Sequence, residues 1–407
     1  MLTADTLNRV CDRVFSQVQS LSLEPGHIHF ELVPPPTIQA LASQGGLPVR
    51  YGHWSFGKSR QRLKTSFDFR MTQIYELVIN HVPTYAFIDQ TATPAQALMM
   101  VAHVSAHADY FRHHRGFFRV ASDMVSVASR HRRTVEEYRQ QFGFYAVESL
   151  LDAAHILADF SGDGLTQQSM GSSKTDVLGH VAKIGPRLKD WERQVLAMVW
   201  DEARYFWPQQ LTRTANEGYA TFCHLKMLHE MPMGATESWE TAQLHASIVQ
   251  VTPPRLNPYH LGQMLYAQAF NEGGWGSVFE ARDLYEDVGL VRAYLTDELA
   301  KAAGLAIFRE RDVGSVGRQA SSDEIRRQMI QDLDHAGLPR LAIEDMGVEL
   351  VLRHHYDGRD LDFAQLPFAL KSVSQRIWKG PVVILTARQG VPHRVRHDGR
   401  EFSDQAV

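Results

Sequence analysis

Two histidines, His103 and His107, have the spacing with the most direct chemical meaning in this sequence. Side chains at positions i and i+4 lie on one face of a helix, about 6 Å apart at Cβ, so both imidazoles can reach one metal ion. The zinc-protease motif His-Glu-x-x-His has the same spacing, and its glutamate acts as the general base. Val104 stands where that glutamate would be, so the pattern predicts a metal site without naming a reaction.

A third candidate ligand, Glu217, lies in the run Asn216-Glu-Gly-Tyr-Ala220. Glycine inside a helix costs about 1 kcal/mol relative to alanine, so Gly218 predicts that something approaches the backbone closely beside Glu217. Some helical zinc peptidases supply their third ligand from a similar Glu-Gly-x-Ala pattern. His224 is seven residues further on, about 10.5 Å along the helix axis. We therefore predict that His224 and Asn216 lie beside the ligands without binding the ion.

Two helices must position these side chains. Thr93 and Pro94 are typical of a helix start, and the predicted helix runs from there to about residue 111. The second predicted helix covers about 209–231. Small and apolar residues surround the two histidines, which indicates a helix packed on most sides. The alternative interpretation is two core histidines with ordinary hydrogen-bond partners. Two histidines at i and i+4 on such a helix favour metal binding instead.

Three carboxylates are candidate general bases in place of the missing glutamate: Glu76, Glu148 and Asp109. Glu76 falls in an apolar run that we predict to be a helix over 68–80. A buried carboxylate there needs a partner, because an unpaired buried charge is costly. The partner can be a metal ion, an arginine or another hydrogen-bond donor.

A second group of polar residues, Glu148, Asp152 and His155, shares one face of a helix predicted over 134–159. Asp-x-x-His resembles the Glu-x-x-His motif of di-metal helical bundles. The alternative is a polar stripe on the protein surface.

Residues 47–58, which include His53, alternate aromatics and glycines without helical period. We interpret this stretch as an ordered loop, either a binding loop or one whose aromatics fill the core.

Composition limits the classes of function. The chain has 407 residues, 44% of them hydrophobic, and a formal net charge of −4, which gives no general attraction to nucleic acid. No stretch approaches the roughly 18 apolar residues of a membrane span, and no signal peptide is evident. Cys11 and Cys223 are the only cysteines, and they form no Cys-x-x-Cys pair. We therefore expect a cytoplasmic protein without disulfides.

The chain divides by composition after about residue 303. We predict a mainly α-helical, zincin-like body over 1–303 that carries the metal site. Residues 304–407 are predicted to form a small α/β module, because segments 305–308, 340–343, 348–353 and 382–387 have strand character. Asp398-Gly399 is typical of a hairpin turn in this module.

Several segments together resemble the stage V sporulation protein R (SpoVR) family. They are Arg50-Tyr-Gly-His-Trp-Ser-Phe-Gly-Lys58, Tyr75-Glu-Leu-Val-Ile-Asn80, Ala102-His-Val-Ser-Ala-His-Ala-Asp-Tyr-Phe111, Asn216-Glu-Gly-Tyr-Ala-Thr-Phe-Cys-His224, Asn257-Pro-Tyr-His-Leu-Gly262 and Leu350-Val-Leu-Arg-His-His355. The sequence departs from the family at Ala106, where glycine is usual. The resemblance implies a cytoplasmic bacterial protein tied to spore cortex formation in spore formers. It also implies two partners, a AAA+ serine protein kinase and a von Willebrand factor A-like protein.

These observations lead to one main hypothesis and two alternatives. The main hypothesis is a zinc-dependent hydrolase of an amide, peptide or cell-wall bond, with His103, His107 and Glu217 as metal ligands. Another divalent metal would fit the same ligand set. The first alternative is a non-catalytic scaffold that works with the kinase and the von Willebrand factor A-like protein. The second is a di-metal helical oxidase that uses Glu148, Asp152 and His155.

Overall fold

The computed structural model describes residues 1–44, 47, 49–56, 76–162, 169–251, 256–305, 307–311, 314–318 and 321–407. They form two compact units. The first contains Met1–Pro48, Gly52–Val125 and Gln209–Leu333, and the second contains Val49–Tyr51, Ser126–Pro208 and Asp334–Val407. The fold is mainly helical with a five-stranded C-terminal sheet, which confirms the predicted fold class. The predicted domain boundary at residue 303 and the zincin-like arrangement stay predictions.

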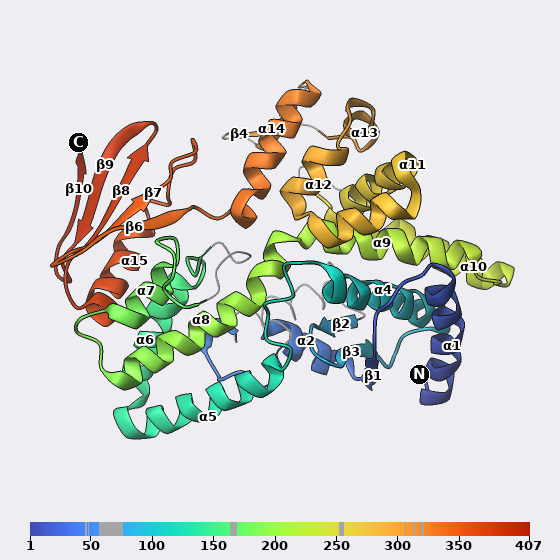
Figure 1. Cartoon of the computed structure of the whole chain (residues 1–407), viewed down its shortest axis with the longest axis horizontal. Helices are drawn as coiled ribbons and strands as arrows, with labels where there is room; N and C mark the ends of the chain where they lie inside the picture. Colours follow the sequence, from blue (N-terminus) through green and yellow to red (C-terminus); the bar gives the residue numbers. More distant parts are fainter. Residues whose placement is uncertain are drawn as a thin grey trace. The chain divides into compact units, whose positions relative to one another are not determined.

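The first unit is built around α4 and α9 (Figure 1). Its helices are α1 (Ala4–Ser20), α2 (Pro35–Ser43), α4 (Pro94–His113), α9 (Arg213–Glu230), α10 (Ala235–Ile248), α11 (Pro258–Leu284), α12 (Asp287–Tyr294), α13 (Asp297–Ala302) and α14 (Ser322–Leu333). A three-stranded sheet has the order β1 (Ile28–Val33), β3 (Thr84–Asp89), β2 (Glu76–Ile79), with β1 parallel to β3. Strands β4 (Ile307–Arg311) and β5 (Gly314–Arg318) form a hairpin.

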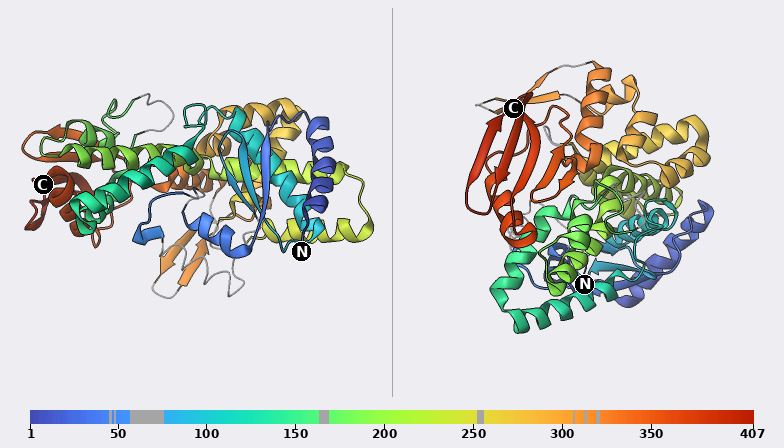
Figure 2. Two further views of the ribbon diagram at one scale, coloured as in Figure 1. Left: turned by 90° about the horizontal axis from the view of Figure 1, so that it is seen from below. Right: turned by 60° about the vertical axis from the view of Figure 1, so that its left-hand side comes forward.

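The second unit combines helices with the C-terminal sheet. It contains most of α5 (Met124–Phe142), α6 (Phe144–Ala158), α7 (Val177–Ile184), most of α8 (Asp190–Leu211) and α15 (Leu366–Ser372). The sheet order is β10 (Phe402–Ala406), β9 (Val391–His397), β8 (Val382–Arg388), β7 (Leu350–His354), β6 (Leu341–Met346). Figure 2 shows these five strands side by side. Only β7 and β8 pair in parallel, and the predicted turn at Asp398-Gly399 joins β9 and β10.

Helix α4 forms because its sequence provides both a start signal and an apolar surface. The Thr93 side chain accepts a hydrogen bond from the Gln96 backbone N–H, and the Gln96 side-chain oxygen accepts one from the Thr93 backbone N–H, as predicted for a capped start. Every residue from Ala97 to Tyr110 is buried. Helix α9 packs on one side against α4 and on the other against α11 (Figure 1). The two predicted ligand-bearing helices are therefore neighbours.

Three predicted elements need correction. Residues Glu76–Ile79 form strand β2 instead of a helix, because a short apolar run fits either element and pairing with β3 decides it. Residues 68–75 lie outside the described part of the chain. The helix predicted over 134–159 is broken by Gly143, whose φ of +92° is not helical. The helix predicted over about 209–231 begins only at Arg213, because Pro208 and the residues up to Leu211 belong to α8.

Candidate metal centre

His103, His107 and Glu217 converge in the first unit. The Nε2 atoms of His103 and His107 lie 3.5 and 3.3 Å from Glu217 Oε2. Among the described residues, this is the one group of three or more His, Cys, Asp or Glu side chains whose ligand atoms all lie within 4.8 Å of one another. Donor atoms at the corners of a tetrahedron with bonds of about 2.1 Å are about 3.4 Å apart. The spacing therefore fits a zinc-sized ion.

Asn216 controls the orientation of the His107 ring. Its side-chain oxygen lies 2.9 Å from His107 Nδ1. An amide oxygen only accepts hydrogen bonds, so His107 Nδ1 carries the proton and Nε2 presents its lone pair toward Glu217. Metal-binding histidines are usually fixed in this way by a partner on the other ring nitrogen. Asn216 thus lies beside the candidate ligand His107, and its predicted role stays a prediction.

His103 is oriented by a chain of two further histidines. His103 Nδ1 lies 2.9 Å from His224 Nδ1, and His224 Nε2 lies 3.0 Å from His245 Nδ1. A neutral imidazole has one N–H, so a free lone pair on His103 Nε2 makes each ring donate toward the next. Burial, together with the neighbouring imidazoles, lowers the pKa of His224 well below its ordinary value. The chain is therefore neutral, as metal ligation at His103 requires.

Glu217 is the charged member of the group. Burial would raise the pKa of its carboxyl, but in the absence of a cation the protonated forms of His107 and His103 outweigh this effect and hold the pKa far below its usual range. Its Oε2 atom is inaccessible to solvent and has no hydrogen-bond partner among the described residues. A buried, ionised carboxylate oxygen is costly without a partner. A cation between this oxygen and the two Nε2 atoms would supply one.

The backbone of α11 approaches Gly218 closely, as the presence of a glycine inside helix α9 predicts. A Cβ atom at Gly218 would lie 2.3 Å from both the Cα and carbonyl carbon of Gly262 on α11. A Cβ at Gly262 would in turn lie 2.3 Å from the Thr214 carbonyl oxygen. The α9 and α11 backbones touch at this point, directly beside Glu217. The two glycines therefore set the position of the helix that carries the carboxylate.

Sequence comparison identifies the family. A family model described as SpoVR like protein matches residues 2–168 and 158–338. The chain belongs to the SpoVR family. The Uncharacterized protein YcgB of Escherichia coli (strain K12) is 26% identical over 279 residues, which is 56% of this chain and 55% of that protein. The chain thus spans about half the length of this curated relative. No solved structure matches.

In this SpoVR-family chain, the Asp109 carboxylate is buried and hydrogen-bonded to groups that hold helices together. Its Oδ2 accepts hydrogen bonds from Arg282 at 2.7 Å and from the Tyr219 hydroxyl at 2.6 Å. Its Oδ1 accepts the Glu24 backbone N–H at 2.6 Å. Burial raises the pKa of Asp109, but His113, Arg282 and the other donors lower it further, so the carboxylate is ionised and occupied. This network joins α4, α9 and α11 with the segment that follows α1.

The other predicted site residues are placed elsewhere. Glu148, Asp152 and His155 lie on α6 in the second unit, where Glu148 pairs with Arg139 and His155 Nε2 is 3.1 Å from the Tyr51 hydroxyl. They do not belong to the candidate metal-binding group of His103, His107 and Glu217 found among the described residues.

His53 is buried in the first unit, with Nδ1 2.7 Å from the Ser55 hydroxyl. The side chain of Glu76 and residue Lys58 of the predicted binding loop lie outside the described part. No helix in the described part of this SpoVR-family chain is long and apolar enough to cross a membrane.

Val104, which occupies the position of the motif's glutamate, does not face the candidate metal-binding group. Val104 packs with Ile28 and Ala86 of the β1–β3 sheet and with Ala108. A glutamate at this position would lie in an apolar core. The general base of a hydrolytic reaction must therefore come from another element.

The structure also reveals residues to which the sequence analysis gave no role at the site: His245, Arg282, Gly262 and Asp287. They lie on α10, α11 and α12 and contact α4 or α9 only after the helices have packed, so no local spacing identifies them. Asp287 accepts the backbone N–H groups of Thr214 and Ala215 at 2.9 and 2.8 Å, at the start of α9. It thereby caps the helix that carries Glu217.

The cap at Asp287 predicts a pH dependence of stability. Burial raises the pKa of its carboxyl from 3.8 to about 7, although the Thr214 and Ala215 N–H groups oppose the shift. The folded state thus binds more protons than the unfolded state between these values. The contribution of Asp287 to stability is therefore fully present below about pH 4 and is lost as the pH rises through 7, a change on the order of 4 kcal/mol. We expect Asp287→Asn to remove this loss.

Urea unfolding at pH 5 and pH 8 measures this effect. The wild type should lose more stability between the two pH values than Asp287→Asn does. Equal losses in the two proteins would show that Asp287 is ionised throughout this range.

Proposed function

We propose that this protein is a metal-dependent hydrolase whose ion, zinc as the first choice, is held by His103, His107 and Glu217. The observation that carries the proposal is the buried Glu217 Oε2 atom, which has no hydrogen-bond partner among the described residues and faces two imidazole Nε2 atoms. Two histidines and one carboxylate are the ligand set of several zinc hydrolases, which leave a fourth position for water. An amide or peptide bond is the substrate class that we propose.

The chain's own residues keep the site ready for an ion. Asn216 and His224 tie up the two Nδ1 atoms, so both Nε2 lone pairs point inward before any ion binds. Low pKa values keep Glu217 ionised and His103 neutral. Burial and the neighbouring His107 lower the pKa of His103. When bound, zinc would supply Lewis acidity and lower the pKa of its water to about 7.

Three carboxylates, Glu76, Glu148 and Asp109, are candidates for the general base that accepts the proton of the attacking water. Asp109 and Glu148 have arginine partners, Arg282 and Arg139, and ion pairing makes a carboxylate a weaker base. Glu76 begins β2, next to α4. We therefore propose Glu76 as the first residue to test as general base.

Metal content tests the proposal directly. After incubation with zinc and exhaustive dialysis, we expect the wild-type protein to retain about one zinc ion per chain, measured by inductively coupled plasma mass spectrometry. Glu217→Gln removes the charge but keeps the shape, and His103→Ala removes one ligand. Each variant should retain far less than one ion.

Glu230→Gln is the matched control for this experiment. Glu230 is an exposed carboxylate at the end of the same helix, α9, so its replacement should leave the metal content unchanged. If the wild-type protein retains no stoichiometric metal under these conditions, the proposal is wrong. Loss of metal in Glu230→Gln would show that the ion binds to general surface charge.

The burial of Val104 also favours a second candidate, a non-catalytic scaffold. Such a protein would bind a AAA+ serine protein kinase and a von Willebrand factor A-like protein, the partners that the family resemblance implies. Co-purification with these two proteins distinguishes the roles. A scaffold keeps both partners and its cellular function in Glu217→Gln, whereas a hydrolase loses its function although the partners remain bound.

A further inference from the structure

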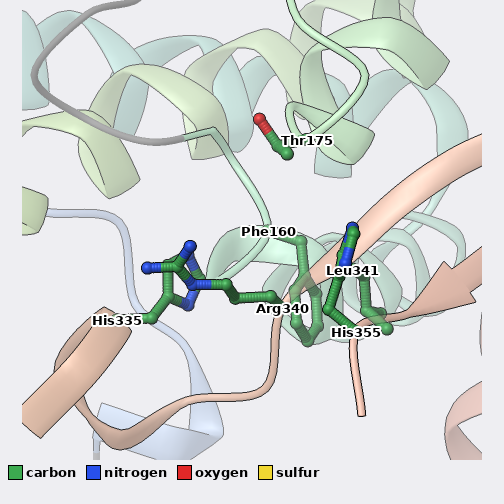
Figure 3. A pocket seen from close by; sticks show the side chains of 6 residues that line it. All are labelled: Phe160, Thr175, His335, Arg340, Leu341 and His355. Atoms are coloured by element: carbon green, nitrogen blue, oxygen red, sulfur yellow. The ribbon is translucent and has the colours of Figure 1, made fainter. Parts of the chain in front are cut away.

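The second unit contains a small cavity with basic side chains. Its volume is about 200 Å³, and six residues line it: Phe160, Thr175, His335, Arg340, Leu341 and His355. Figure 3 shows Thr175 on one side of the opening and the other five side chains opposite. None of these six residues belongs to the metal-binding group. The cavity is therefore a separate candidate site.

Backbone contacts hold the cavity walls together. Arg340 precedes β6 and His355 follows β7, and the His355 N–H donates to the Arg340 carbonyl at 2.9 Å. The segment with Thr175 is tied to β6 because the Ile343 N–H donates to the Lys174 carbonyl at 2.8 Å. Three chain segments, distant in sequence, thus present a guanidinium, an imidazole and a hydroxyl to one space.

His335 has an unusual backbone. Its φ and ψ angles are 54° and 37°, in the left-handed region that non-glycine residues rarely adopt. The next residue, Ala336, is also left-handed, with φ 56°. Such conformations cost on the order of 1 kcal/mol or more and persist where surrounding structure holds them. The His335 ring packs edge-on against Trp207, 4.7 Å between centroids, which holds it at the cavity wall.

The lining chemistry matches a phosphoryl group. It offers the donors of one arginine, two histidines and one hydroxyl, and none of the six lining residues is acidic. Asp334 contacts Arg340 at 2.8 Å, but both side chains are about half exposed, and such pairs contribute little. A guanidinium fork binds phosphate oxygens through paired hydrogen bonds. Because the Asp334–Arg340 pair contributes little, Arg340 can bind a phosphoryl group instead of, or together with, Asp334.

The apolar part of the lining limits the size of the ligand. Phe160 and Leu341 provide an aromatic and an aliphatic surface beside the donors. Cavities that hold drug-sized ligands are usually 300–1,000 Å³, so this space is too small for a nucleotide. We propose that this cavity binds a phosphoryl group, either on a small phosphomonoester or as free phosphate.

Isothermal titration calorimetry with the full chain tests this site. The probes are phenyl phosphate, inorganic phosphate and phenol, which separate the contributions of the ring and the phosphoryl group. We expect phenyl phosphate to bind with a Kd of about 1 mM or tighter, and phenol not to bind. Tighter binding of phenyl phosphate than of phosphate identifies a phosphomonoester site, and equal binding identifies a phosphate site. Absence of binding by both anions overturns the proposal.

Arg340→Gln and Arg353→Gln form a matched pair of variants. Arg340 and Arg353 are 51% and 50% exposed, and each has a carboxylate partner at 2.8 Å, Asp334 or Glu344. Only Arg340 lines the cavity, so Arg340→Gln should weaken phenyl phosphate binding about tenfold or more, while Arg353→Gln leaves it unchanged.

Thr175→Val is a second, independent variant of the cavity. It removes a hydroxyl donor without changing the charge, and we expect weaker binding of phenyl phosphate. Similar losses in Arg340→Gln and Arg353→Gln, with no loss in Thr175→Val, would assign the binding to general positive charge and refute the site.

Discussion

Replacement of Gly218 with alanine is expected to destabilise the protein by about 2 kcal/mol. The new Cβ would lie 2.3 Å from two backbone atoms of Gly262, so no side-chain rotation can relieve the clash. Overpacking of this kind usually costs about 1–3 kcal/mol, and a collision between two backbones lies at the upper end. The gain of about 1 kcal/mol in helix propensity offsets only part of the cost. Helices α9 and α11 must therefore move apart.

Gly276→Ala provides the matched control. Gly276 lies on α11, the same helix as Gly262, and a Cβ there meets nothing within 4 Å. This substitution should be neutral, or stabilising by up to about 1 kcal/mol. Urea unfolding followed by circular dichroism compares the two variants. Equal unfolding midpoints would show that the helices do not touch at Gly218.

Gly218→Ala also bears on the candidate metal site. Any movement of α9 away from its present position displaces Glu217 relative to the histidines of α4. We therefore expect Gly218→Ala to lose zinc even under conditions where it stays folded. Retention of zinc by a folded Gly218→Ala protein would show that the site does not depend on this helix contact.

The parts of the site that depend on spacing within one helix could be predicted from the sequence. Helical periodicity places His103 and His107 on one face, and helix propensity marks Gly218 as a point of close approach. The sequence wrongly predicts a helix at Glu76, because the apolar run Leu77-Val-Ile79 is too short to distinguish a helix from a strand. Pairing with β3, a tertiary contact, makes it a strand.

Contacts between distant segments account for what the sequence did not predict. Arg282 lies 173 positions from Asp109, and no spacing rule relates them. His245 follows His224 by 21 positions and belongs to another helix. Residues of this kind become visible only after the helices have packed, because each side chain alone has an ordinary local environment in the sequence.

Removal of Arg282 is the second substitution with a large expected effect. Asp109 is completely buried, and the Arg282 guanidinium at 2.7 Å is its cationic partner. Loss of one member of a buried pair leaves an uncompensated charge and typically costs about 3–5 kcal/mol. We expect Arg282→Met to be destabilised by this amount in urea unfolding at pH 8.

The surface pair Arg13–Glu237 is the control for this prediction. Its side chains are 37% and 26% exposed, and the two groups lie 2.7 Å apart. Exposed pairs usually contribute less than about 1 kcal/mol, so Arg13→Met should have a much smaller effect than Arg282→Met. Similar losses in both variants would show that Asp109 does not depend on its buried partner.

A pH series distinguishes an unpaired charge from lost packing. In the wild type the pKa of Asp109 is low, because His113, Arg282 and the other donors outweigh burial, so its pairing stabilises the fold above the ordinary carboxyl pKa. Without Arg282, burial raises this pKa, and the folded state gains from protonation. The difference between Arg282→Met and the wild type should therefore shrink from pH 8 to pH 5. The double variant Asp109→Asn/Arg282→Met should recover stability at pH 8, since it contains no buried charge. A pH-independent difference without recovery in the double variant would assign the loss to the packing of the arginine side chain.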